Sequence, residues 1–129
     1  MATHVEGNFE NKGWDEQTVS EFDGTKITHA RVRQTFAGGI TGDADIDWQM
    51  YYRPDGTASF VGLAKITGAV DGRNGTLVVT SNGEFDGKEV RGDWVVVGAT
   101  AEIDGLTGTG TFAAPMGPSG TYSFDYEAG

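Results

Sequence analysis

Apolar and polar side chains alternate along most of this chain. In residues 31–36, and again in residues 45–52, the even positions hold mostly apolar or aromatic side chains, and the odd positions hold mostly charged or polar ones. A repeat of two residues is typical of β-strands, because successive side chains of a strand point to opposite faces, whereas a helix repeats every 3.6 residues. The alternation therefore predicts strands and no helix of consequence.

Glycine separates the alternating segments. The sequence contains 21 glycines and only 3 prolines. Pairs such as Asp-Gly and Gly-Gly supply the positive φ angles of tight hairpin turns. They occur at residues 23–24, 38–39, 55–56, 71–72, 86–87 and 104–105, and a Gly-Pro-Ser-Gly turn is expected at residues 117–120. The spacing predicts an antiparallel meander in which each interval between turns is one long strand.

The first hairpin whose register can be derived surrounds residues 54–56. The apolar positions are even on both sides of Pro-Asp-Gly, and facing residues of a hairpin must point to the same side of the sheet. An odd loop is therefore required. A three-residue turn with a bulge at Gly56 satisfies this condition and pairs Met50 with Phe60.

The second such hairpin surrounds residues 86–87. The apolar positions change here from odd before the turn to even after it, which requires an even loop. Asp-Gly in a two-residue type I′ turn meets this requirement. This register predicts that Val79 pairs with Trp94 and that Val78 pairs with Val95.

Closure of the sheet follows from the length of the strands. An open sheet of long strands would expose two edges, and closure removes both. Glycines within the strands allow the tight coiling that a small barrel needs. We therefore expect one domain, residues 1–129, in an all-β fold: a closed antiparallel up-and-down barrel of about eight strands. The interior of such a barrel is either filled by side chains or holds one small ligand.

Composition narrows the range of partners. The 129 residues carry 9 Lys and Arg against 19 Asp and Glu, a formal charge of −10. This charge repels nucleic acid and anionic lipid, so we expect neither nucleic acid nor a membrane as a partner. The chain has no cysteine, its first residues do not resemble a secretion signal, and it has no long apolar run. We expect a cytoplasmic protein without a cofactor.

Aromatic residues dominate the apolar positions and are the candidates for a ligand site. They line a cavity or simply fill the lumen, and both alternatives stay open at this point. Four polar residues share the parity of this face and could orient a ligand through hydrogen bonds: Gln34, Tyr52, Glu102 and Tyr122. The candidate ligand-binding residues are Gln34, Phe36, Trp48, Met50, Tyr52, Phe60, Trp94, Phe112 and Tyr122.

Glu102 is the candidate catalytic residue. If its side chain faces the lumen, it is the best placed general acid or base in the chain. The alternative is a glutamate at the rim of the barrel, in contact with water. The face of the strand after residues 104–105 is not fixed by the pattern, so the sequence leaves both alternatives open.

The sequence contains few residues that could form a metal site or a catalytic triad. Asp43, Asp45 and Asp47 lie on one strand face, but a Trp stands where a calcium loop requires Gly, and no Glu closes the loop. A basic row at residues 29, 31 and 33 is expected to face this acidic row and to form ion pairs in water. Because the chain has only two histidines, we predict neither a metal site nor a Ser-His-Asp triad.

The opposite face of the sheet carries an apolar patch. The type I′ register brings together on three neighbouring strands the residues Val61, Leu63, Val78, Val95 and Val97. Soluble monomers rarely leave such a patch bare. We expect either a homo-oligomer that buries this outer patch or cover by the N-terminal segment.

Several segments resemble a bacterial family of unknown function. The segment of residues 48–63, Trp-Gln-Met-Tyr-Tyr-Arg-Pro-Asp-Gly-Thr-Ala-Ser-Phe-Val-Gly-Leu, is similar to the family designated domain of unknown function 3224. So are residues 83–87, 105–108, 112–115 and 124–126. The resemblance implies a barrel like that of allene oxide cyclase, a plant enzyme that folds a reactive epoxide inside an apolar cavity. Family members tend to carry His after Ala-Pro, where this chain has Met116, and Thr-Gly-Glu-Leu where it has Ala-Glu-Ile at 101–103.

Three functions remain compatible with these features. The first is a barrel that binds a small, largely apolar metabolite among aromatic walls. The second is a cyclase or isomerase that encloses an apolar substrate, with Glu102 or a tyrosine transferring protons. The third is an oligomeric barrel with a filled core and no ligand.

Overall fold

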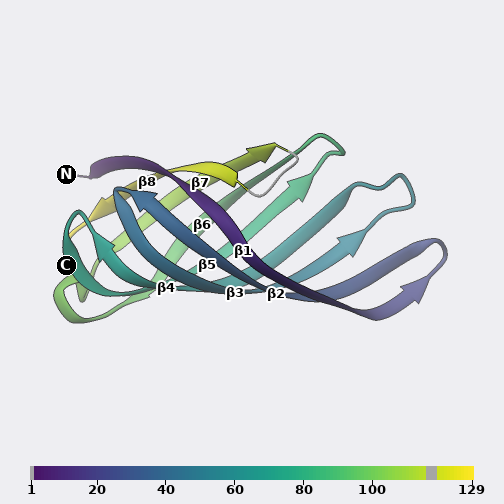
Figure 1. The fold of residues 1–129 in the computed structure, drawn as a ribbon, viewed down its shortest axis with the longest axis horizontal. Helices are drawn as coiled ribbons and strands as arrows, with labels where there is room; N and C mark the ends of the chain where they lie inside the picture. The colour runs from purple at the N-terminus through teal and green to yellow at the C-terminus, as the bar shows by residue number, and fades with distance from the viewer. Residues whose placement is uncertain (1, 116–118) are drawn as a thin grey trace.

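The chain forms one antiparallel sheet that closes on itself (Figure 1). The computed structural model describes residues 2–115 and 119–129. Each strand pairs with the next, and the last pairs with the first, which makes a closed barrel. The elements are β1 (Thr3–Phe22), β2 (Thr25–Gly38), β3 (Ile40–Tyr52), β4 (Ala58–Val70), β5 (Arg73–Phe85), β6 (Glu89–Ala99), the 3₁₀ turn η1 (Ala101–Ile103), β7 (Thr107–Pro115) and β8 (Ser119–Glu127). The predicted fold class, a closed all-β meander of eight strands, is confirmed.

The hairpin between β3 and β4 has the predicted register. Met50 lies opposite Phe60. The Gly56 amide donates to the Arg53 carbonyl at 3.0 Å, and the Arg53 amide donates to the Thr57 carbonyl at 2.9 Å, so three residues form the loop. Gly56 adopts a φ of 88°, the positive value that a glycine supplies without strain.

The register predicted for the hairpin between β5 and β6 is wrong. Val79 faces Val96 rather than Trp94, and Val78 faces Gly98 rather than Val95. The carboxylate of Asp86 accepts hydrogen bonds from the backbone amides of the second and third residues after it, at 2.8 and 2.9 Å, and this widens the turn. The wider turn has the same parity as a two-residue turn. The alternation of the strands therefore could not distinguish the two registers.

Large rings fit into the narrow lumen because glycines face them across the strands. Trp48 lies opposite Gly62, and Phe60 lies opposite Gly83. The same pairing joins Trp94 to Gly110, Phe112 to Gly92, Phe9 to Gly120 and Tyr122 to Gly7. At each of these six glycines an added Cβ would overlap the facing ring. The strand glycines therefore make room for aromatic side chains, in addition to allowing the sheet to coil.

The two ends of the barrel differ. At one end lie the two chain termini, the turns at residues 38–39 and 71–72, and η1. Buried aliphatic side chains pack this end: Ile40, Val70, Leu77, Ile103 and Leu106. At the other end the β1–β2 hairpin extends beyond the neighbouring turns (Figure 1). We call these the packed end and the hairpin end.

Two further observations complete the fold. Among the described residues, no helix is long and apolar enough to cross a membrane. The Gly-Pro-Ser-Gly turn expected at residues 117–120 falls largely outside the described residues, as does Met116.

Candidate functional site: a cavity in the barrel lumen

A cavity of about 430 Å³ occupies the lumen toward the hairpin end. The strand ends next to the β3–β4 and β5–β6 turns line it, together with the middle of β1 and β2. Its lining consists of Phe9, Asn11, Trp14, Gln34, Trp48, Met50, Tyr52, Ala58, Phe60, Phe85, Val90, Phe112, Ala114 and Pro115. The volume and the mostly apolar walls match those of small-molecule sites in proteins.

The structure divides the predicted ligand residues into two groups. Six of the nine line the cavity: Gln34, Trp48, Met50, Tyr52, Phe60 and Phe112. Phe36, Trp94 and Tyr122 lie deeper, around a residual space of only about 40 Å³. There Trp94 stacks on Phe124 with 4.9 Å between ring centroids. The sequence left open whether the lumen is filled or hollow. It is filled around Trp94 and hollow toward the hairpin end.

Tyr122 fixes the β2–β3 turn. Its hydroxyl oxygen accepts a hydrogen bond from the Ile40 amide at 2.8 Å. The same hydroxyl lies 2.9 Å from the Ala37 carbonyl oxygen and 3.0 Å from that of Ile40. Burial raises the pKa of this phenol, which keeps it neutral. The Tyr122 hydroxyl is therefore engaged by backbone atoms of the β2–β3 turn and does not point into the cavity of about 430 Å³.

Two amide side chains supply polar groups in the cavity wall. The Gln34 amide nitrogen donates to the Asn11 side-chain oxygen at 2.8 Å. Asn11 and Gln34 lie opposite each other on β1 and β2. This pairing leaves the Gln34 oxygen as an acceptor and the Asn11 nitrogen as a donor for a ligand.

Glu16 lies just behind the cavity wall and holds three side chains. Its carboxylate accepts hydrogen bonds from Tyr52 Oη at 2.7 Å, Thr28 Oγ1 at 2.6 Å and Trp14 Nε1 at 2.9 Å. Burial raises the pKa of Glu16, but the three donors outweigh it, and the net pKa is lowered. The pKa of Tyr52 is raised by burial and by its hydrogen bond to this carboxylate. At neutral pH the pair is thus an ionised Glu16 and a protonated Tyr52.

The strand alternation gave no indication of Glu16, because β1 changes phase. Asn11 pairs with Gln34 and Gly13 with Arg33, so one extra residue, Lys12, is inserted between them. A β-bulge of this kind moves the inward face from odd to even positions. The available signal was the shift from an odd aromatic residue, Phe9, to an even one, Trp14.

Glu102 does not face the lumen. It lies in η1 at the packed end, it is exposed, and its Oε1 accepts a hydrogen bond from the Asn74 amide at 2.7 Å. The hypothesis that Glu102 faces the lumen as a general acid or base is therefore wrong. The alternative, a glutamate at the rim in contact with water, describes Glu102 correctly. The cause is the 3₁₀ turn, which interrupts the strand alternation after β6.

The charged rows of β2 and β3 face each other on the outer surface. Arg31 pairs with Asp47, and Arg33 pairs with Asp45. Asp47 Oδ1 lies 3.3 Å from Arg31 Nε and 3.4 Å from His29 Nε2. Within the described ranges, no three His, Asp or Glu side chains are placed to hold a metal ion. Asp47 therefore forms exposed cross-strand ion pairs of the predicted kind, with Arg31 and His29.

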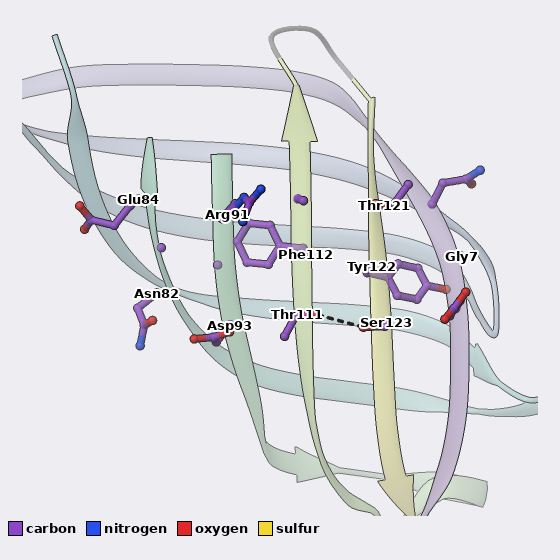
Figure 2. Close-up of a pocket in the computed structure, with 15 residues that line it drawn as sticks. Gly7, Asn82, Glu84, Arg91, Asp93, Thr111, Phe112, Thr121, Tyr122 and Ser123 are labelled. Carbon is purple, nitrogen blue, oxygen red and sulfur yellow. Dashed lines mark hydrogen bonds between the residues drawn. The ribbon is translucent and has the colours of Figure 1, made fainter. Parts of the chain in front are cut away.

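A second hollow lies outside the barrel, on the outer surface of β5 to β8 and the start of β1. This open groove has a volume of about 1020 Å³. Figure 2 shows the side chains that line it, among them Asn82, Asp93 and Thr111. Thr111 and Ser123 form a hydrogen bond of 2.9 Å across β7 and β8 (Figure 2). The groove is wide and open, and most of its side chains are polar or charged, so the lumen cavity is the stronger candidate for an apolar ligand.

The apolar side chains predicted on the outer face are exposed, but they do not meet as predicted: Thr80 lies between Leu63 and Val95, and Val78 faces Gly98. Val61, Leu63, Val95 and Val97 are each about half exposed, with exposed fractions of 53%, 50%, 48% and 58%. Val78 is partly buried beside them. The N-terminal segment does not cover the patch, because β1 is paired between β2 and β8. The other predicted cover, self-association, stays a prediction.

The fold and the cavity define a class of small closed β-barrels whose lumen is packed at one end and hollow at the other. The sequence model of the family described as "Protein of unknown function (DUF3224)" matches residues 5–126, and the chain belongs to this family. A crystal structure of a DUF3224 protein of unknown function from Shewanella oneidensis MR-1 is similar, with a TM-score of 0.79 and 21% sequence identity. The match covers 100% of this chain and 99% of that one. No curated protein matches the sequence.

Proposed function

We propose that this protein binds one small, largely apolar molecule in the lumen cavity at the hairpin end. The observation that carries the proposal is the cavity itself: about 430 Å³, bounded by aromatic side chains, beside a lumen that is otherwise packed. An empty space of this size forfeits the packing contacts of its walls. A ligand would restore those contacts and bury its own apolar surface at the same time.

The position of the cavity supports binding rather than a packing defect. A simple defect would be closed by the neighbouring rings, yet Trp48 is fixed edge-on against Phe60, with 4.8 Å between ring centroids. Each of these rings lies directly against the backbone of the glycine opposite it. These contacts restrict Trp48 and Phe60, and side chains that are already restricted lose little conformational entropy on binding.

A second candidate function is a cyclase or isomerase reaction on an enclosed apolar substrate. The observation that favours it is the Tyr52–Glu16 hydrogen bond beside the cavity, which could transfer a proton to or from a substrate. The resemblance to the barrel of allene oxide cyclase points in the same direction, as an analogy of fold alone. Once a bound molecule is identified, turnover by the parent and by Tyr52→Phe would separate an enzyme from a binding protein.

The test of binding combines co-purification with a blocked variant. Ala114 lines the cavity on β7, and Ala114→Trp should fill it. Ala113, the preceding residue, lies in the outer groove, so Ala113→Trp adds the same bulk outside the lumen. Native mass spectrometry would detect a co-purified molecule that leaves on denaturation, and titration with the uncharged dye N-phenyl-1-naphthylamine would measure occupancy directly.

The expected result is binding by the parent and by Ala113→Trp, and loss of binding in a folded Ala114→Trp. Circular dichroism would confirm that both variants fold. If the parent carries no bound molecule and does not take up the dye, or if Ala114→Trp binds as well as the parent, the proposal is wrong.

A further inference from the structure

The polar groups of the lumen cavity are all uncharged. Among the described residues that line it, the polar side chains are Asn11, Gln34 and Tyr52. A charged ligand group would lose its hydration on entry and would find no counter-charge in the wall. The lining therefore disfavours carboxylates, phosphates and amines alike.

Two charges of opposite sign, Glu16 and Lys26, lie beside Tyr52 and offset each other, so an ion of either sign gains little net attraction. The Glu16 carboxylate, next to Tyr52, repels an anionic ligand group. Its oxygens already accept three hydrogen bonds, so they are less available to a cationic group. The Lys26 ammonium lies 4.9 Å from the centroid of the Tyr52 ring and repels a cation. The hairpin end of the cavity is thus suited to a neutral molecule.

The hydrogen bond to Glu16 also fixes what Tyr52 can offer a ligand. The single phenolic proton has two acceptors in reach, Glu16 Oε2 at 2.7 Å and Met50 Sδ at 3.6 Å. A carboxylate is the stronger acceptor, so the proton points to Glu16. Met50 belongs to the cavity wall, which places the phenol oxygen at the cavity boundary with a lone pair remaining.

We propose, resting on the lumen as the binding site, that the ligand is uncharged and carries a hydroxyl group whose proton is accepted by Tyr52 Oη. Glu16 is the positioning residue, because it holds Tyr52 in the orientation of an acceptor. The Gln34 oxygen, whose neighbouring amide nitrogen donates to Asn11, offers a second acceptor in the same cavity. The ligand class is therefore an apolar alcohol or phenol rather than a fatty acid or an amine.

Four naphthalene probes of similar shape test this proposal by isothermal titration calorimetry. They are 2-naphthol, its methyl ether, 2-naphthoate and 2-naphthylmethylammonium, which differ in charge and in the hydroxyl proton. We expect 2-naphthol to bind about 2- to 10-fold more tightly than the methyl ether, the range of one net hydrogen bond. The two ions should bind more weakly than either neutral probe.

Tyr52→Phe removes the acceptor and should abolish the difference between 2-naphthol and its methyl ether. Tyr51→Phe is the matched control, because Tyr51 lies on the outer face of the same strand, stacked on Phe22 at 6.4 Å. The control should keep the preference of the parent. Retention of the preference in Tyr52→Phe would overturn the role of Tyr52.

The remaining outcomes separate this inference from the proposed function. If 2-naphthoate or 2-naphthylmethylammonium binds most tightly, and Ala114→Trp blocks it, the lumen is a site but the ligand class is wrong. Equal binding of 2-naphthol and its methyl ether to the parent would refute the hydroxyl preference in the same way. If no probe binds to the parent, the lumen site itself fails, and the inference fails with it.

Discussion

The aromatic–glycine pairs across the strands make a sharp prediction about stability. In Gly110→Ala, the new methyl group would overlap Trp94 Cε2 and lie 2.7 Å from Cζ2. Trp94 is 5% exposed and cannot move away easily, because Phe124 is stacked on it at 4.9 Å. The extra methyl group must therefore displace two rings or the backbone of β7.

The magnitude follows from measured costs of overpacking. Insertion of a methyl group into a packed core typically destabilises a protein by about 1–3 kcal/mol. Because both partners of the contact are held, we expect the upper half of this range, about 2–3 kcal/mol. For a domain of this size that corresponds to a decrease in melting temperature of about 8–12 °C.

Gly98→Ala is the matched control for this substitution. Gly98 also lies in a strand, but an added Cβ would meet only Val78 Cβ, at the ordinary contact distance of 3.9 Å. We expect no loss of stability there, since alanine also restricts the unfolded chain. Thermal unfolding, followed by near-ultraviolet circular dichroism of the tryptophans, measures both variants. Equal melting temperatures for Gly110→Ala and Gly98→Ala would refute the view that glycines are selected by the facing rings.

Three further predictions concern other parts of the barrel. Tyr122→Phe should lower the free energy of unfolding by about 1–3 kcal/mol in urea titrations, because the Ile40 amide loses its acceptor; an unchanged midpoint would contradict this role. The pKa of Glu16 is lowered in the folded protein. Its contribution to the free energy of unfolding is therefore fully present above its ordinary pKa of 4.5, and it is lost as the pH falls through the lower pKa of the folded state. Urea midpoints from about pH 3 to pH 7 should therefore fall more steeply with acid in the parent than in Glu16→Gln, and parallel profiles would refute this. Finally, we expect the parent to self-associate through the outer patch and Leu63→Lys to sediment as a smaller species, with Thr67→Lys as the control; a monomeric parent would disprove the expectation.

Local patterns predicted most of the fold. The alternation of residues 31–36 and 45–52 placed β2 and β3 in the correct phase, and the even parity around Gly56 gave the correct β3–β4 register. Parity is a strong constraint because a slip of one residue moves every apolar side chain to the wrong face. Parity cannot distinguish turns whose lengths differ by two residues. The turn after Phe85 was therefore predicted to have two residues, whereas it has four.

The candidate site was predicted only in part, for a related reason. Gln34 and Tyr52 lie on regular strands, so their inward direction could be derived from the pattern. Glu16 follows the bulge at Lys12, and Glu102 lies in η1, where no strand alternation applies. At both places the direction of the side chain depends on a local irregularity that leaves little trace in the sequence.

The sequence by itself determined the faces of the regular strands, the hairpin topology and the closure of the sheet, because these depend on the two-residue period and on glycine at the turns. The tertiary structure alone decided which part of the lumen is filled and which is hollow. That outcome depends on how six rings settle against six glycines on neighbouring strands, and on where a bulge directs one carboxylate. Such packing joins residues far apart in the chain, and only the closed barrel brings them together.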